Sequence, residues 1–309
     1  MNIDPLNQTN LFGYSKYLKE FIKLYEQNKL PNKILLSGEK GIGKCTAAYH
    51  LINYILSLNE DYPYDLINFN INLENKSFKL TQNKTNPNFN LVDVAEDKKN
   101  IDINQIRNLI TDLNKSSFNL KPRFVLIDNI DLLNINSVNA LLKIIEEPND
   151  NIIFILINNN RKILSTLKSR CLNFKITITH DKSIEIVNKI LNDDIYELLN
   201  KDLINNYSTP GQLLNIIKLG VENNIDLKNI SLNNLLSSII NNKLYKKENT
   251  TKDLIYSLIE VFFRNNVSIN NIKLIDMYCY FLRKINNTKT FNLDEESLFM
   301  EFEDRILNG

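Results

Sequence analysis

The segment that most constrains the fold is a glycine-rich loop between an apolar run and an amphipathic stretch. Its sequence fits the pattern G-x-x-x-x-G-K over Gly38–Lys44. The apolar residues 34–36 before it predict a buried strand, and apolar residues recur at helical spacing from 47 to 55. Strand, glycine loop and helix in this order are the context in which backbone N–H groups cradle phosphate oxygens. The sequence therefore predicts a phosphate-binding loop (P-loop).

The candidate nucleotide-binding residues of this loop are Gly38, Gly41, Gly43, Lys44, Cys45 and Thr46. We expect Lys44 to reach the β- and γ-phosphates. The next position normally carries a hydroxyl that holds magnesium, but here it is Cys45, and Mg²⁺ prefers hard oxygen ligands to a soft thiol. Thr46 carries a hydroxyl one residue later, but on a helix it points about 100° away from the direction of residue 45 and is not expected to substitute. The loop is thus expected to bind phosphate poorly or without firm magnesium, unless Thr46 or water compensates.

A second nucleotide motif is indicated by the apolar run Phe124–Ile127 followed by Asp128. Asp128 could hold magnesium through water. Taken alone, it would better fit an acid that caps a turn at the strand end, but together with the glycine loop the magnesium role is favoured. ATPases of this type usually place Glu next, whereas this chain has Asn129, and an amide cannot act as a general base. We expect Asp131 to lie at the surface. One of the asparagines 158–160 could orient a water or the γ-phosphate, or simply form a turn.

The order of apolar and amphipathic segments predicts an α/β domain. Strands are expected over 34–36, 91–94, 124–127, 152–157 and 172–176, with helices between them. Such alternation favours a mostly parallel sheet covered on both faces. The segment 59–90 is polar, lacks clear periodicity and is expected to be an insertion with some short structure. After about residue 180 only helical patterns remain.

Composition excludes several classes of protein. The formal charge is +1, from 37 basic and 36 acidic residues, so bulk charge does not favour non-specific nucleic-acid binding. The three cysteines, Cys45, Cys171 and Cys279, form no CxxC pair, and with two histidines they predict no zinc site. Isolated cysteines fit a reducing cytosol. The sequence contains no run of about 18 apolar residues, the length that a membrane span needs. We therefore expect a cytoplasmic protein.

Two further motifs identify a resemblance to a known family. They are Ala140-Leu141-Leu142-Lys143-Ile144-Ile145-Glu146-Glu147-Pro148 and Ser169-Arg170-Cys171. Together with Gly38–Lys44 and Ile127-Asp128 they resemble bacterial clamp-loader subunits of the AAA+ class. The resemblance implies an AAA+ P-loop α/β domain over 1–175, a small helical lid over 176–222 and a helical collar over 223–309 that assembles a pentamer.

Two kinds of subunit in that family differ in their catalytic residues. The tau/gamma motor subunit hydrolyses ATP, whereas the delta-prime subunit has a decayed site. Lys44-Cys45, Asp128-Asn129 and Gln212, which stands where the family often has an arginine, favour delta-prime. The family commonly carries a four-cysteine zinc module, which this chain lacks. The implied partners are the motor and delta subunits, and through them the sliding clamp and primed DNA.

The resemblance also gives Arg170 a role. Taken alone, an arginine before a strand would be structural or solvated. In the family it is supplied in trans to a neighbour's ATP, where it stabilises charge on the transferred phosphoryl group. No cofactor is then required, although the loop could hold ATP, ADP or phosphate weakly. The alternatives are an active motor ATPase, a P-loop nucleotide kinase and a binding module without nucleotide.

Overall fold

The computed structural model describes residues 3–95, 98–115, 119–146, 151–247, 249–267, 272–291 and 293–308. Its contacts divide the chain into two compact units, Met1–Lys182 and Ser183–Gly309. The first unit is α/β and the second is helical, as the sequence predicts. The predicted boundary between lid and collar at residue 222 stays a prediction.

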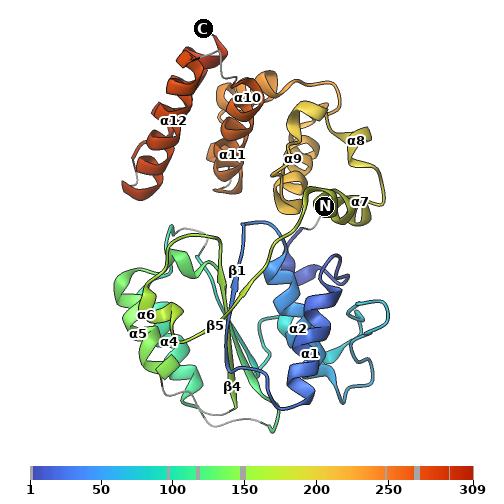
Figure 1. Cartoon of the computed structure of the whole chain (residues 1–309). Coiled ribbons are helices and arrows are strands. Elements are labelled where there is room, and N and C mark those ends of the chain that lie inside the picture. The colour runs from blue at the N-terminus through green and yellow to red at the C-terminus, as the bar shows by residue number, and fades with distance from the viewer. Residues whose placement is uncertain are drawn as a thin grey trace. The chain divides into compact units, whose positions relative to one another are not determined.

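A parallel sheet forms the centre of the first unit (Figure 1). Its described strands are β1 (Lys33–Ser37), β2 (Phe89–Val92), β3 (Arg123–Ile127), β4 (Ile152–Asn158) and β5 (Leu172–Lys175). Their order in the sheet is β2-β3-β4-β1-β5, and every described pair is parallel. The predicted strands are confirmed, with β2 beginning two residues earlier than expected. Parallel neighbours need crossover connections, which the intervening helices supply.

Helices cover both faces of this sheet. They are α1 (Ser15–Glu26), α2 (Lys44–Ser57), α3 (Lys76–Gln82), α4 (Ile103–Leu113), α5 (Ile135–Glu146) and α6 (Ser165–Lys168). Figure 1 shows α1 and α2 on one side and α4, α5 and α6 on the other. Side chains alternate along the strands, so Ile34 and Leu36 pack with α1 and α2, whereas Leu35 packs with α4 and α5.

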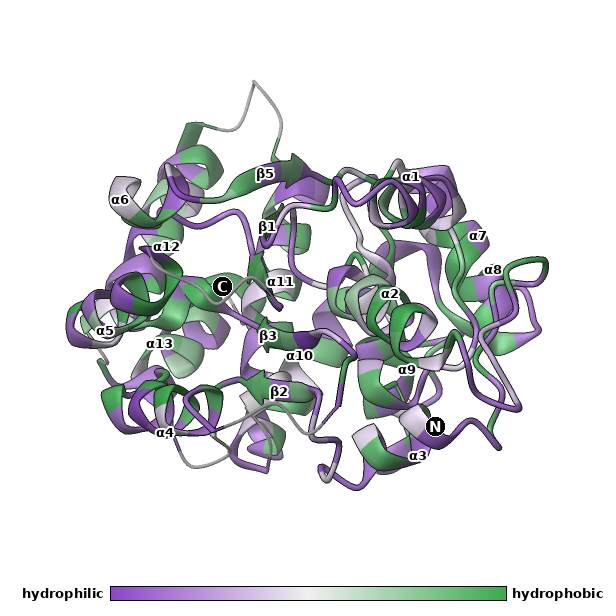
Figure 2. Cartoon of the chain, turned by 90° about the horizontal axis from the view of Figure 1, so that it is seen from below, coloured by the Kyte–Doolittle hydropathy of each residue, from purple (hydrophilic) through white to green (hydrophobic). Residues whose placement is uncertain are grey.

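The two central strands, β3 and β4, are apolar on both faces because both faces are covered. Phe124–Ile127 are fully buried, and Ile152–Ile157 are all at most 8% exposed. The covering helices instead carry apolar and polar residues on different sides, which Figure 2 shows as green and purple along α4 and α5. Burial of this apolar surface, at about 25 cal/mol per Å², provides the main stabilisation of the first unit.

The first part of the polar insertion of residues 59–90 is held on α2 by buried hydrogen bonds. The Tyr64 hydroxyl lies 2.8 Å from Nδ1 of His50, and the Tyr64 N–H donates to the Ser57 hydroxyl. The Asn75 side chain accepts from Nδ2 of Asn53 on α2 at 3.0 Å, donates to the carbonyl of Tyr62 at 2.6 Å and caps α3. These bonds satisfy polar groups that would otherwise be costly to bury. Burial lowers the pKa of His50 to about 4, so this histidine is neutral. A layer of hydrogen-bonded polar side chains therefore anchors the insertion.

The second unit consists of helices in the residues described. They are α7 (His180–Leu191), α8 (Ile195–Leu198), α9 (Pro210–Asn223), α10 (Leu232–Asn241), α11 (Asn249–Asn266), α12 (Ile272–Phe291) and α13 (Glu295–Phe302). Its core contains an aromatic cluster in which Phe263, Phe281 and Phe302 meet with ring centroids 5.3–6.0 Å apart. Such spacing is favourable for aromatic pairs. None of the described helices is both long and apolar enough to span a membrane.

Candidate functional site

The site is built at one edge of the sheet, where the parallel strands end together. Ser37 of β1 pairs with Asn158 of β4, and Ile127 of β3 pairs with Leu156 of β4 and Val92 of β2. The residues that follow these ends are therefore brought side by side. The carboxyl ends of strands in open α/β sheets are the usual place for ligand binding. Among the residues so assembled are Gly38, Asp93, Asp128 and Asn159.

The glycines give the loop a backbone that other residues adopt only under strain. Gly41 and Gly43 have φ angles of 85° and 97°, in the region that favours glycine. Gly38 is required by space, since an added Cβ would lie 2.5 Å from the backbone oxygen of Ile176. The Tyr14 hydroxyl donates to the Ile42 carbonyl at 2.5 Å. The loop is thus fixed by Tyr14, at the N-cap of α1, as well as by its own glycines.

Lys44 directs all three of its ammonium donors to oxygens of its own chain. Nζ lies 3.0 Å from the Gly38 carbonyl, 2.6 Å from the Glu39 carbonyl and 3.0 Å from Oδ1 of Asn159. Burial lowers the pKa of Lys44 to about 8, an effect partly offset by Asp128 and Asp131. An ammonium group has only three donors. A phosphate group must therefore displace oxygens that already bind Lys44.

The Cys45 thiol lies beside the Asp128 carboxylate, which follows the last residue of β3. Burial raises the pKa of Cys45 well above its usual value, and the nearby Asp128 charge raises it further. Burial also raises the pKa of Asp128, with the Asp93 charge adding to the effect. The two positions that would hold magnesium in an ATPase are here occupied by a protonated thiol and a carboxylate whose pKa is raised by burial. These residues do not fit a firmly bound magnesium–nucleotide complex.

Asn129 lies within a continuous chain of hydrogen bonds. Lys44 donates to Oδ1 of Asn159, whose Nδ2 donates to Oδ1 of Asn129 at 2.7 Å. Nδ2 of Asn129 then donates to Oδ1 of Asp93 at 2.8 Å. Lysine can only donate and an ionised aspartate can only accept, so the two ends fix the orientation of both amides. We call Lys44, Asn159, Asn129 and Asp93 the amide relay.

Asp131 corrects one expectation from the sequence. Its side chain is only 2% exposed, so the prediction of a surface residue is wrong. Its carboxylate accepts from the Asn159 N–H at 3.2 Å and pairs with Arg161 at 3.5 Å. Asp131 follows β3 by four residues, and the turn after that strand brings it back against the end of β4. It therefore supports the amide relay through the backbone of Asn159.

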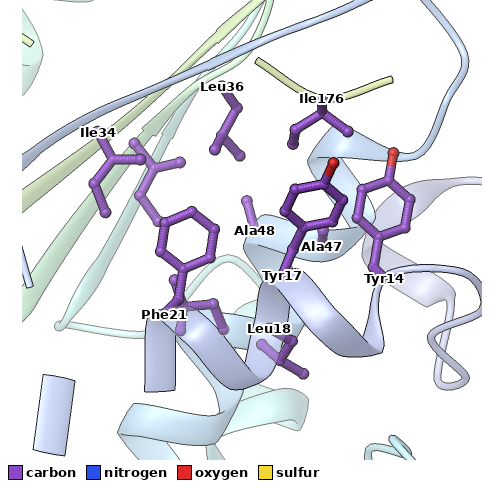
Figure 3. A pocket seen from close by; sticks show the side chains of 11 residues that line it. Tyr14, Tyr17, Leu18, Phe21, Ile34, Leu36, Ala47, Ala48 and Ile176 are labelled. Atoms are coloured by element: carbon purple, nitrogen blue, oxygen red, sulfur yellow. The ribbon is translucent and has the colours of Figure 1, made fainter. Parts of the chain in front are cut away.

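A small apolar hollow lies near the loop, between α1, α2 and the sheet (Figure 3). Its volume is about 10 Å³, and its lining includes Tyr14, Phe21, Leu36, Ala48 and Ile176. That is room for about one water molecule, far less than a nucleobase needs. The hollow is a packing defect of the core. The described residues also contain no cluster of three or more His, Cys, Asp or Glu able to hold a metal.

Arg170 lies between α6 and β5, away from the amide relay in sequence. Its Nη1 donates to the Thr166 carbonyl at 2.9 Å, and its Nη2 lies 2.6 Å from Oε1 of Glu146 at the end of α5. The side chain is 36% exposed. Sequence reasoning did not predict the pairing with Glu146, although this glutamate belongs to the motif that carries the resemblance. The next two motif residues, Glu147 and Pro148, lie outside the described residues.

Gln212 is used for helix capping in the second unit. Its side chain accepts from the Thr209 N–H at 2.9 Å, while the Thr209 hydroxyl accepts from the Gln212 N–H. This reciprocal pair is a capping box at the start of α9. The side chain at the position where the family often has an arginine thus has a local structural partner.

The parallel sheet, the P-loop after β1, the acid after β3 and the helical second unit define a P-loop protein of the AAA+ class. The model of the family described as "DNA polymerase III, delta subunit" matches residues 13–180, more than half of the chain. The chain belongs to this family, and several of its curated relatives are named DNA polymerase III subunit delta'.

Curated relatives carry the names of two kinds of subunit. The DNA polymerase III subunit delta' of Buchnera aphidicola subsp. Schizaphis graminum is 27% identical over 289 residues, covering 88% of this chain and 84% of that protein. The subunit gamma/tau of Mycoplasma genitalium is 30% identical over 188 residues. That match covers 60% of this chain but 30% of the gamma/tau protein. The chain thus aligns with most of a delta' relative and with under a third of this gamma/tau relative.

A solved structure shows the same fold. It is a DNA polymerase III gamma subunit-related protein from Thermotoga maritima, with a TM-score of 0.50 and 18% identity. The match covers 92% of this chain and 96% of that chain. The predicted α/β class with an AAA+ P-loop unit is confirmed.

Proposed function

We propose that this chain is a non-catalytic, delta-prime type subunit of a DNA polymerase III clamp loader. In this role it is a stator that supports loading of the sliding clamp on primed DNA. It does not hydrolyse ATP at its own P-loop. Instead it supplies Arg170 in trans to the ATP site of a neighbouring subunit.

The observation that carries the proposal is the amide relay together with the Cys45–Asp128 pair. The residue at the expected general-base position is Asn129, whose amide is bonded on both sides and has no basic group to offer. The residue at the magnesium position is Cys45, a thiol beside Asp128, and burial and the Asp128 charge raise the pKa of this thiol. Lys44 is already bound to three oxygens. Lys44 and Asn129 are thus engaged in hydrogen bonds within the chain, and Cys45 offers no hard oxygen for magnesium.

Arg170 supports the second part of the proposal by its chemistry and its exposure. Its guanidinium is held at a defined place beside α5 and α6 but remains 36% exposed. A planar fork of N–H donors suits a phosphate group. An arginine supplied by a neighbour can raise phosphoryl-transfer rates by a factor of about 10³ to 10⁵. Arg170 is therefore the residue of this chain that we assign to catalysis, on a nucleotide bound elsewhere.

The proposed partners are the tau/gamma motor and delta subunits, held through the helical second unit as a collar. The sliding clamp and primed DNA are reached through the assembled complex. With a formal charge of +1, the chain has no bulk field to attract DNA by itself. No cofactor is required; the loop binds ATP, ADP or phosphate at most weakly, and zinc has no role. The protein acts in the cytoplasm.

The second candidate is an active motor ATPase, which the gamma/tau relative at 30% identity favours. That function needs a magnesium ligand and a base at Cys45 and Asn129, and neither side chain supplies one. A decayed site on a shared fold explains both the similarity and the substitutions. The delta-prime function is the better account.

ATP turnover by the purified chain separates the two candidates. We expect turnover far below about 1 per second, a typical lower value for an enzyme of this kind, with or without primed DNA. We also expect the chain to co-purify with co-expressed motor and delta subunits. Turnover above about 1 per second would support the motor ATPase. Failure to co-purify with both partners would contradict the stator role.

A further inference from the structure

The guanidinium group of Arg170 has two acceptors in its own chain, and they differ in kind. The Thr166 carbonyl, four residues earlier and within α6, is neutral and accepts from Nη1 at 2.9 Å. The Glu146 carboxylate, on the last residue of α5, is charged and lies 2.6 Å from Nη2. Arginine has five N–H donors, so these contacts leave others for a further partner. The first acceptor orients the side chain, and the second neutralises it.

Neutralisation matters because an arginine in trans acts through its charge. A phosphate group that approaches Arg170 while Glu146 is paired also approaches the carboxylate. Its attraction to the guanidinium is then opposed by repulsion over a comparable distance. Full stabilisation of a phosphate therefore requires Arg170 to leave Glu146.

The exposure of the pair makes such an exchange easy. The side chains of Arg170 and Glu146 are 36% and 49% exposed. Exposed ion pairs contribute little to stability because water screens both charges and competes for both groups. A phosphate carries more negative charge than a carboxylate and offers more acceptors. It can therefore displace Glu146 while the neutral contact to Thr166 keeps the side chain in place.

We propose that Glu146 is the resting counter-ion of Arg170 and that a neighbour's nucleotide phosphate replaces it. This inference rests on the proposed function of Arg170. Glu146 is then a positioning residue that sets the nucleotide concentration at which Arg170 engages. It does not set the rate once Arg170 is engaged.

The test is the DNA-stimulated ATPase of the reconstituted complex with Glu146→Gln in this chain. Glutamine keeps the shape and an acceptor oxygen but removes the charge. We expect the ATP concentration for half-maximal rate to fall by a factor of roughly two to five, with the maximal rate unchanged. In an Arg170→Ala background the same substitution should have no effect. Glu146→Asp keeps the charge and should stay near wild type.

The matched control is Glu74→Gln, which removes one charge from an exposed ion pair with Lys79 in the same unit. It should leave the half-maximal concentration unchanged. Thermal unfolding of each variant checks that the chain remains folded.

Three results would overturn the inference. The first is that Glu146→Gln leaves the half-maximal ATP concentration unchanged or raises it, while Arg170→Ala lowers the rate. This result would refute the exchange and leave the proposed function intact. A lowered maximal rate with Glu146→Gln would make Glu146 a support that Arg170 needs when engaged. No effect of Arg170→Ala would refute the proposed function, and this inference with it.

Discussion

Lys44 of the P-loop donates to Oδ1 of Asn159 across 3.0 Å and so ties the loop to the end of β4. The contact makes Asn159 a bridge, because its other amide atom donates to Asn129. The P-loop lysine is thereby connected, through two amides, to Asp93 after β2. The polar side chains at this edge of the sheet therefore form a continuous hydrogen-bond network.

Removing the bridge should destabilise the first unit. Asn159→Leu leaves the Asn129 oxygen without its donor and deprives Lys44 of one acceptor. We expect a loss of about 1–3 kcal/mol in unfolding free energy, the usual cost of unpaired buried polar groups. Urea unfolding followed by circular dichroism measures it. The control is Asn104→Ala at an exposed site on α4, expected to change stability by less than about 0.5 kcal/mol. Equal midpoints for the two variants would contradict a structural relay.

Restoring the hydroxyl at position 45 should introduce magnesium dependence. With wild type we expect the weak affinity for ATP or ADP to be the same in Mg²⁺ and in chelator. Cys45→Ser supplies a hard oxygen ligand, and we expect affinity in Mg²⁺ to rise by roughly tenfold. Isothermal calorimetry in both buffers measures this. If wild type already depends on Mg²⁺ and Thr46→Val removes that dependence, Thr46 is the compensating ligand.

The buried histidine should make stability depend on pH. Burial lowers the pKa of His50 from 6.5 to about 4 in the folded chain. The unfolded chain therefore binds more protons between these values, so stability is complete above pH 6.5 and falls as the pH drops toward 4. The expected loss from pH 7 to pH 5 is about 2 kcal/mol. His50→Gln should show a shallower loss over this range, measured by urea unfolding at both pH values. Parallel curves would contradict a neutral buried His50.

Much of the first unit could be predicted because its signals are local. Apolar runs such as Phe124–Ile127 and the glycine loop each indicate structure from adjacent residues, and the structure confirms both. The sequence does not indicate α3 (Lys76–Gln82) within the segment 59–90, since only a few of its residues are buried and its pattern is polar. The start of this helix is marked by the N-cap Asn75, whose side chain accepts from the Phe78 N–H, and not by a periodic apolar pattern.

The candidate site was predictable in its residue types but not in its contacts. The substitutions at Cys45 and Asn129 are visible in the sequence, because each departs from a known pattern. The contribution of Asp93, the burial of Asp131 and the pairing of Glu146 with Arg170 depend on strand and helix ends far apart in sequence. No local sequence pattern indicates which of these strand and helix ends lie next to each other in the fold.

The central claim, that Arg170 and not the P-loop is the functional site, is tested most directly by Arg170→Ala in the reconstituted clamp loader. The measurement is DNA-stimulated ATP hydrolysis, with Arg107→Ala as control because Arg107 is an exposed arginine on α4 of the same unit. We predict that the ATPase rate of the complex falls to the rate that its remaining ATP sites support. Loss of an arginine supplied in trans lowers the rate at the site it completes by a factor of about 10³ or more. Arg107→Ala should match wild type. An unchanged rate with Arg170→Ala, in a complex that assembles normally, would contradict the account.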